Sequence, residues 1–228
     1  VIRSIWNLIG IEDSAKQAES DGRPLRIFDF ATGSGGFLVE AASALRSRYD
    51  QQKKKGAGKT VQSLVNDLAS GLIGVENQRF PAYLSELNLL VQIGQLLKGE
   101  PSVRIPPLGV LPTDSLSLAN PTQGYEDKAE FGAELLIPDH ERSSKAADVK
   151  SPATSGNYFD ITCGNPPYVG EKKSAAMLDA TREKYPYWDQ YVSQRMDYLY
   201  WFLILGLSKL RKGGRFGFIT TEYWLRAT

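Results

Sequence analysis

The stretch that decides the fold is Leu25-Arg-Ile-Phe-Asp-Phe-Ala-Thr-Gly-Ser-Gly-Gly-Phe-Leu38. Its first six residues are mostly apolar and predict a short buried strand. The glycines that follow allow positive φ and let the backbone approach a ligand closely. From Phe37 to Tyr49 the apolar residues recur at helical spacing. The stretch therefore predicts a strand, a glycine turn and a helix.

Further helices and strands are predicted on either side of this unit. Upstream, the pattern predicts a helix over Val1–Ile9 and a polar connector over Glu12–Pro24. Downstream, it predicts a lysine-rich loop over Gln51–Thr60. The later helices are expected over Val61–Ala69, Phe80–Leu97 and Gln194–Leu210, and the later strands over Gly71–Glu76, within Val103–Leu111, over Tyr158–Cys163 and over Arg215–Thr220. In the helix over Phe80–Leu97 the predicted apolar side carries Leu84, Leu87, Leu90, Val91 and Leu96.

This alternation predicts an α/β fold, Rossmann-like, with a mostly parallel sheet and helices on both faces. We expect a single catalytic domain over residues 1–228, with an insertion at about 118–157, where the pattern weakens. Active sites in such sheets lie beyond the carboxyl ends of the strands. The residues of interest below all follow predicted strands.

Composition narrows the possible functions. The chain has 228 residues, is 42% hydrophobic, and carries a net charge of +1, so any attraction to a polyanion must be local. A single cysteine, Cys163, and a single histidine, His140, argue against disulfides and a zinc site and fit a cytoplasmic protein. The apolar run Leu199–Leu207 is too short to cross a membrane and predicts a buried helix. Because the chain begins at Val1 rather than Met, we expect it to be a segment of a longer protein.

Two glycine-containing motifs resemble nucleotide-binding loops but do not match them. Gly56-Ala-Gly-Lys-Thr60 has Lys53 where a phosphate-binding loop requires its first glycine, so a solvated loop is the better interpretation. The turn at Gly33 and Gly35 lacks the third glycine of the dinucleotide motif. Even so, the helix start beyond this turn suits a carboxylate or a phosphate.

Two acids sharpen the prediction of a ligand at the glycine turn. Glu76 ends a predicted strand, where a carboxylate can accept hydrogen bonds from both hydroxyls of a ribose. Asp114 ends a less certain strand and is placed to accept a hydrogen bond from an adenine amino group. The alternative for each is a helix-capping or surface acid.

The tetrapeptide Asn165-Pro166-Pro167-Tyr168 is the most informative in the chain. An aromatic amine or an amide is a poor nucleophile because its lone pair is delocalised. The Asn165 side-chain oxygen and the Pro166 carbonyl can accept its two N–H bonds and return electron density to nitrogen. The prolines stiffen the turn, and Tyr168 offers a face on which a planar group can stack. A rigid structural turn is the alternative interpretation.

These motifs together resemble the adenine-specific amino-methyltransferases of DNA, as in restriction–modification and related phage-defence systems. The resemblance spans about Leu25 to Trp224. It implies S-adenosylmethionine as cofactor and duplex DNA, with a flipped-out adenine, as partner. By the same resemblance the turn holds the methionine part of the cofactor, Glu76 its ribose and Asp114 its adenine. The implied turn residues are Asp29, Ala31, Thr32, Gly33, Ser34, Gly35 and Phe37. Asn165–Tyr168 would bind the target base, and Asn165 also adjoins the cofactor.

The sequence departs from the family in several places. Ala31 and Thr32 stand where proline and cysteine are common. The upstream cofactor segment, the last two strands of the sheet and a target-recognition domain are expected to lie outside the chain. Lys172 and Lys173 are candidates for phosphate contacts or for a solvated loop. The loop over Val169–Tyr191 contains aromatic residues that either line the base pocket or hold the loop in place: Tyr185, Tyr187, Trp188 and Tyr191.

Two rival functions stay open at this stage. Protein methyltransferases that act on a glutamine side-chain amide also carry Asn-Pro-Pro-Tyr, and an amide fits the same two-acceptor logic. A non-catalytic module that binds only cofactor or DNA is the other alternative, against which the intact Asn165–Tyr168 argues.

Overall fold

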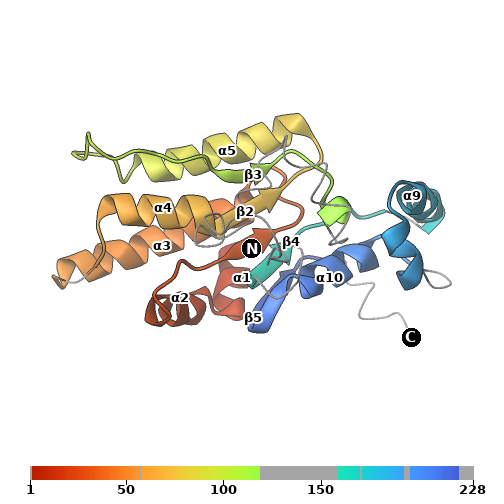
Figure 1. Cartoon of the computed structure of the whole chain (residues 1–228), viewed down its shortest axis with the longest axis horizontal. Coiled ribbons are helices and arrows are strands. Elements are labelled where there is room, and N and C mark those ends of the chain that lie inside the picture. The colour runs from red at the N-terminus through yellow and green to blue at the C-terminus, as the bar shows by residue number, and fades with distance from the viewer. Residues whose placement is uncertain (1, 57, 119–158, 170, 193–195, 221–228) are drawn as a thin grey trace, which may run out of the picture.

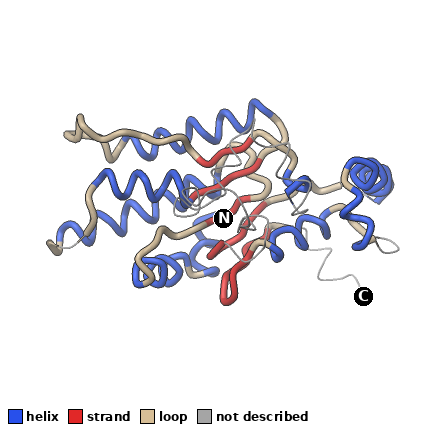
Figure 2. Tube along the Cα trace, viewed as in Figure 1, coloured by secondary structure: helices blue, strands red, loops and turns tan. Residues whose placement is uncertain are grey.

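The computed structural model describes residues 2–56, 58–118, 159–169, 171–192 and 196–220, and the side chains of 171–174 are not among the described parts. Five strands form one parallel sheet in the order β3-β2-β1-β4-β5 (Figures 1 and 2). They are β1 (Ile27–Asp29), β2 (Leu72–Val75), β3 (Gly109–Leu111), β4 (Phe159–Gly164) and β5 (Leu210–Phe218). The predicted Rossmann-like α/β fold is confirmed.

After β3 the chain crosses to the other side of β1, so the strand order changes direction between β1 and β4. β2 and β3 are added on one side of β1, and β4 and β5 on the other. Asp29 is aligned with Gly74 of β2 on one side and with Cys163 of β4 on the other. The carboxyl ends of β1 and β4 thus form the topological switch point, where open parallel sheets bind their ligands.

Alternation along β1 divides the core into two layers. Ile27 packs into a cluster with α1 (Ile2–Ile9), α2 (Ile11–Ser20), α3 (Gly36–Lys54), α4 (Val61–Gly71) and α5 (Arg79–Gly94). Phe28 and Phe30 belong to the second cluster, with α10 (Leu199–Ser208), the 3₁₀ helix η1 (Ser115–Leu118) and the 3₁₀ helix η3 (Pro186–Tyr191). Helices therefore cover both faces, because a strand that is buried on both sides needs apolar cover on each.

Most predicted elements are present, but several boundaries are wrong. The connector over Glu12–Pro24 is largely helix α2, because Ile11, Ala15 and Ala18 form a buried stripe within its polar sequence. Helix α3 continues to Lys54, into the predicted lysine-rich loop. Strand β5 begins at Leu210, five residues before the predicted start at Arg215, and passes through the glycine pair.

The buried side of α5 agrees only in part with the predicted one. The side chains that face the core are Ala82, Ser85, Leu89 and Ile93, whereas Leu87 is 37% and Val91 60% exposed. A small side chain stands where α5 passes the glycine turn, since a Cβ built on Gly35 would lie 2.5 Å from Ser85 Oγ. Of the predicted apolar side, Leu90 and Leu96 do pack into the core, whereas Leu87 and Val91 do not.

The loop predicted over Val169–Tyr191 is mostly helical. It contains α9 (Glu171–Lys184) and then η3. The predicted helix Gln194–Leu210 is confirmed as the shorter α10, with residues 193–195 outside the described parts. The expected insertion at 118–157 and His140 also fall almost entirely outside the described residues. No helix in the described ranges is long and apolar enough to cross a membrane.

Candidate active site

The glycine turn after β1 is fastened to the neighbouring strand by its own backbone and by Thr32. The Thr32 amide donates to the Val75 carbonyl (3.0 Å), and its hydroxyl donates to the Asp29 carbonyl (2.9 Å). Gly33 and Gly35 have φ of 55° and 88°, the left-handed region that side chains other than glycine adopt at a cost. The side chain of Thr32 is thus buried and structural, and the turn is rigid before any ligand arrives.

Asp29 is the most unusual group at this turn. Its side chain is fully buried. Oδ1 accepts a hydrogen bond from the Ala31 amide (3.2 Å), while Oδ2 is buried without a hydrogen-bond partner among the described residues. Burial raises the pKa of Asp29 to about 7, the Ala31 N–H opposes this rise, and the charge of Glu76 adds to it. A buried carboxyl oxygen without a partner can form a hydrogen bond or ion pair with a bound ligand.

Glu76 lies directly after β2 and reaches back to the glycine turn. Its Oε2 accepts a hydrogen bond from the Gly33 amide (3.0 Å), and its Oε1 accepts one from the Gln78 amide (2.9 Å), just before α5. Each oxygen retains a lone pair, so the half-buried carboxylate can still accept two hydroxyls. The structure thus brings Glu76 and the turn together.

Asp114 follows β3 and has two neighbours. Its Oδ1 accepts a hydrogen bond from the Leu116 amide (3.0 Å) and so caps η1, as the structural alternative predicted. Its Oδ2 lies 3.8 Å from Nζ of Lys184 at the end of α9. This contact, which no local sequence pattern predicts, connects the segment after the Asn-Pro-Pro-Tyr turn to the loop that follows β3.

Asn165–Tyr168 emerges from the end of β4 as predicted. Asn165 is exposed, and its Oδ1 accepts a hydrogen bond from the Tyr168 hydroxyl (2.6 Å). Pro166 is buried, Pro167 is exposed, and Tyr168 is 51% exposed. The tetrapeptide therefore combines an anchored proline with two polar or aromatic groups that are free to meet a ligand.

The ends of β1 and β4 are paired up to this point. The Phe30 amide donates to the Cys163 carbonyl (3.1 Å), and on the other side of β4 the Ile219 amide donates to the Gly164 carbonyl (3.0 Å). The glycine turn and the Asn-Pro-Pro-Tyr turn consequently leave adjacent strands at the same edge of the sheet. A ligand at one turn would lie beside a ligand at the other.

The remaining predicted turn residues have structural contacts. Phe37 is 4% exposed and packs edge-on against Trp6, with ring centroids 5.8 Å apart, so its side chain belongs to the core. The Ser34 carbonyl accepts a hydrogen bond from Asn88 Nδ2 of α5 (2.9 Å). Asn88 was not predicted, because a polar residue on an exposed helix face gives no signal in one sequence.

Comparison with known proteins identifies the family of the chain. The family model of the Eco57I restriction-modification methylase matches residues 71–228. The chain belongs to this family. No curated protein sequence matches it significantly. Among solved structures it is similar to the "ATP-dependent Type ISP restriction-modification enzyme LlaBIII bound to DNA", with a TM-score of 0.60 and 16% identity, over 96% of this chain and 14% of that one. That likeness shows the fold, and the chain spans about one seventh of the length of that enzyme.

In this Eco57I-type chain the aromatic residues after α9 hold their segment in place. Trp188 is fully buried, its Nε1 donates to the Leu116 carbonyl (2.9 Å), and its ring stacks on Trp201 at 5.3 Å. Tyr187 and Tyr191 pack against Trp188 at 5.6 and 5.9 Å. Of the two alternatives, the structure thus assigns Trp188 to holding the loop. The side chains of Lys172 and Lys173 lie outside the described parts.

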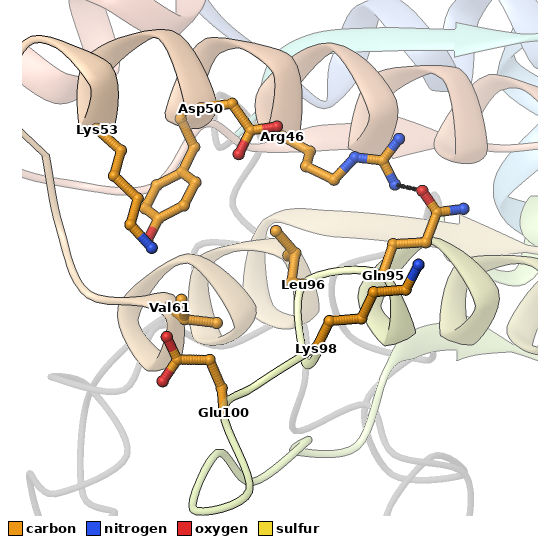
Figure 3. Close-up of a pocket in the computed structure, with 9 residues that line it drawn as sticks. Arg46, Asp50, Lys53, Val61, Gln95, Leu96, Lys98 and Glu100 are labelled. Atoms are coloured by element: carbon orange, nitrogen blue, oxygen red, sulfur yellow. Dashed lines mark hydrogen bonds between the residues drawn. The ribbon is translucent and has the colours of Figure 1, made fainter.

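A pocket of about 340 Å³ elsewhere in the chain is not this site (Figure 3). It lies between the last turns of α3, the start of α4 and the segment after α5, and is lined by Arg46, Tyr49, Asp50, Lys53, Val61, Gln95, Leu96, Lys98 and Glu100. Helix α3 begins at the glycine turn and rises about 1.5 Å per residue. The residues of α3 that line the pocket are therefore roughly 15–25 Å from the turn. Three cations and two acids line it, so its charge favours no particular ligand.

Proposed function

We propose that this chain transfers a methyl group from S-adenosylmethionine to the exocyclic N6 amino group of an adenine flipped out of duplex DNA, in restriction–modification or phage defence. The observation that carries the proposal is the placement of the Asn165–Tyr168 turn on the strand next to the glycine turn, with both at the carboxyl edge. Family membership favours DNA over a glutamine amide as substrate.

The residues present fit the cofactor by the chemistry of their free atoms. Asp29 Oδ2 is a buried oxygen without a hydrogen-bond partner in the part of the chain that the structure describes. A Cβ built on Gly33 would meet nothing within 4 Å, so there is open space over the turn. Glu76 would accept the ribose hydroxyls and Asp114 the adenine amino group, while backbone amides at the start of α3 suit the methionine carboxylate. When bound, the cofactor supplies an electrophilic methyl group on a sulfonium.

The roles of the protein groups in transfer follow from Asn165–Tyr168. Asn165 Oδ1 and the Pro166 carbonyl would accept the two amino hydrogens of the target, which localises the lone pair on nitrogen and aligns it with the methyl group. Tyr168 would stack on the base, which is worth roughly 1–3 kcal/mol and offsets part of the cost of flipping. This mechanism needs no strong general acid or base, which is consistent with a chain that has one histidine.

The test is a transfer assay with the natural full-length protein and cofactor labelled in its methyl group. Duplex DNA and a protein release factor are supplied in parallel reactions. The proposal predicts label in N6-methyladenine of the DNA, and an Asn165→Ala variant that still binds cofactor but transfers nothing. Label in the release factor alone, or unchanged turnover by Asn165→Ala, would overturn it.

A further inference from the structure

A buried acid without a counter-ion lies at the centre of the proposed cofactor site. Asp29 is fully buried, and its Oδ2 has no hydrogen-bond partner among the described residues. None of the ion pairs in the described ranges includes Asp29 or Glu76. A carboxylate buried without a cation costs so much free energy that it normally takes up a proton instead.

The groups around Asp29 favour its protonated form. Glu76 approaches from the end of β2 and contributes a second negative charge. Cys163 faces it from β4 as a buried thiol whose own pKa is raised, first by burial and then by the Asp29 charge. Among the described residues, only the Ala31 amide stabilises the ionised form of Asp29, by donating a hydrogen bond to Oδ1. The site thus combines two acids, a neutral thiol and no positive charge.

We propose that Asp29 is protonated in the free protein and gives up this proton when a cationic ligand, the ammonium- and sulfonium-bearing methionine end of the cofactor, docks against Oδ2. The proposal rests on the proposed function, because that function supplies the cation. The cationic ligand then replaces the proton as the group that neutralises the carboxylate. The O–H bond of the carboxyl breaks, the proton leaves to solvent, and the carboxylate pairs with the ligand. Cofactor affinity is thereby coupled to pH through a residue that takes no part in methyl transfer.

The exchange has a measurable thermodynamic consequence. If binding releases a proton, the association constant rises with pH by up to tenfold per unit while Asp29 is protonated in the free protein, and levels off once it is ionised. Because burial raises the pKa of Asp29 to about 7, the rising part falls between roughly pH 5 and 7. The opposite dependence is expected of a site that must first take up a proton.

The experiment is calorimetric titration of the full chain with S-adenosylmethionine at pH 5.5, 6.5 and 7.5, in buffers of different ionisation enthalpy. The dependence of the observed heat on buffer gives the number of protons released. We expect close to one proton at pH 5.5, fewer at 7.5, and none in excess of the cofactor's own titration for Asp29→Asn, which keeps the acceptor for the Ala31 amide. The difference between the two proteins cancels the titration of the cofactor.

Infrared difference spectroscopy of the wild-type chain provides a measurement that does not depend on folding of the variant. Addition of cofactor at pH 5.5 should remove one protonated-carboxyl band and produce one carboxylate band. Binding without proton release, or equal release by Asp29→Asn, would overturn this inference while leaving the proposed function intact. Absence of cofactor binding at every pH would overturn both.

Discussion

The Tyr168 hydroxyl donates a hydrogen bond to Asn165 Oδ1 across 2.6 Å, within the turn that follows β4. This bond holds the Asn165 carboxamide in place, with its oxygen toward the Tyr168 hydroxyl. Oδ1 keeps a second lone pair for a target amine. Tyr168 therefore has two separable roles in the proposed mechanism: its ring stacks on the base and its hydroxyl orients the acceptor.

Substitution at Tyr168 should separate these roles. Tyr168→Phe keeps the ring and loses one hydrogen bond, worth about 0.5–1.5 kcal/mol, so we expect turnover to fall roughly two- to tenfold. Tyr168→Ala also loses the stacking, worth roughly 1–3 kcal/mol, and should weaken DNA binding as well. Single-turnover rates and DNA affinities check both. Equal effects of the two substitutions would mean that the ring contributes nothing.

The two glycines of the turn should respond differently to alanine. At Gly35 a Cβ would lie 2.5 Å from Ser85 Oγ and 3.1 Å from Ser85 Cα, so α5 must shift. We expect Gly35→Ala to lower the free energy of unfolding by about 2 kcal/mol or more, in the range of overpacked sites. Denaturation in urea measures the change.

Gly33 is the matched control, since its φ is also positive but a Cβ there meets no atom within 4 Å. Gly33→Ala should cost about 1 kcal/mol of stability, from backbone conformation alone. It should nevertheless weaken cofactor binding, because the methyl group projects into the space assigned to the ligand. A Gly33→Ala protein that binds cofactor normally would contradict that assignment.

The stability of the free protein should carry the pH signature of Asp29. Its pKa in the folded protein is about 7, above the ordinary value near 4 that the unfolded chain has. The folded state therefore binds the proton more tightly, and the burial cost is absent below about pH 4, grows between 4 and 7, and is constant above. The wild type should lose on the order of a few kcal/mol across that interval relative to Asp29→Asn. Urea midpoints at several pH values test this, and parallel curves for the two proteins would contradict it.

An ion network at the opposite end of β4 offers a contrast. Asp160 has no exposed side-chain surface and accepts hydrogen bonds from both terminal nitrogens of Arg23 (2.7 and 2.8 Å), from the Arg26 amide and from Arg211. Burial acts to raise the pKa of Asp160, but these partners outweigh it and lower the pKa. The stabilisation is thus present at neutral pH and is lost as the pH falls below about 4.

Removal of the Asp160 charge should affect stability and leave the site intact. Breaking a buried ion pair costs about 3 kcal/mol or more, so Asp160→Asn should unfold at markedly lower urea concentration. Because Asp160 lies near the amino end of β4, the cofactor dissociation constant of the folded variant should stay within about twofold of the wild type. A large loss of affinity at unchanged stability would contradict this division between the two ends of the sheet.

The sequence was sufficient for the strands and for the main turns, because buried strands and glycine turns carry strong local signals. The residues Asp29–Gly35, Glu76 and Asn165–Tyr168 lie at one edge of the sheet as the alternation of strands and helices predicted. Helix α2 was missed because a mostly polar sequence hides a stripe of Ile11, Ala15 and Ala18. The buried face of α5 was predicted only in part: Ser85 was missed because a small polar residue that packs against Gly35 carries no apolar signal.

Contacts between distant segments could not be predicted from one sequence. The proximity of Lys184 to Asp114 and of Asn88 to Ser34 depends on how α9 and α5 pack, which no local pattern encodes. The absence of a described partner for Asp29 Oδ2 is likewise a property of the packed structure. The sequence predicted the residues of the turn, and packing determined that one of them, Asp29, is a buried acid without an ion-pair partner among the described residues.

The most direct test of the central claim is to map methylated bases in DNA from cells that express the natural full-length protein, beside cells that express its Asn165→Ala variant. The account predicts N6-methyladenine at one recurring sequence in the first DNA and none above background in the second. DNA without N6-methyladenine from cells that contain the folded wild-type protein, or the same methylation with both proteins, would contradict it.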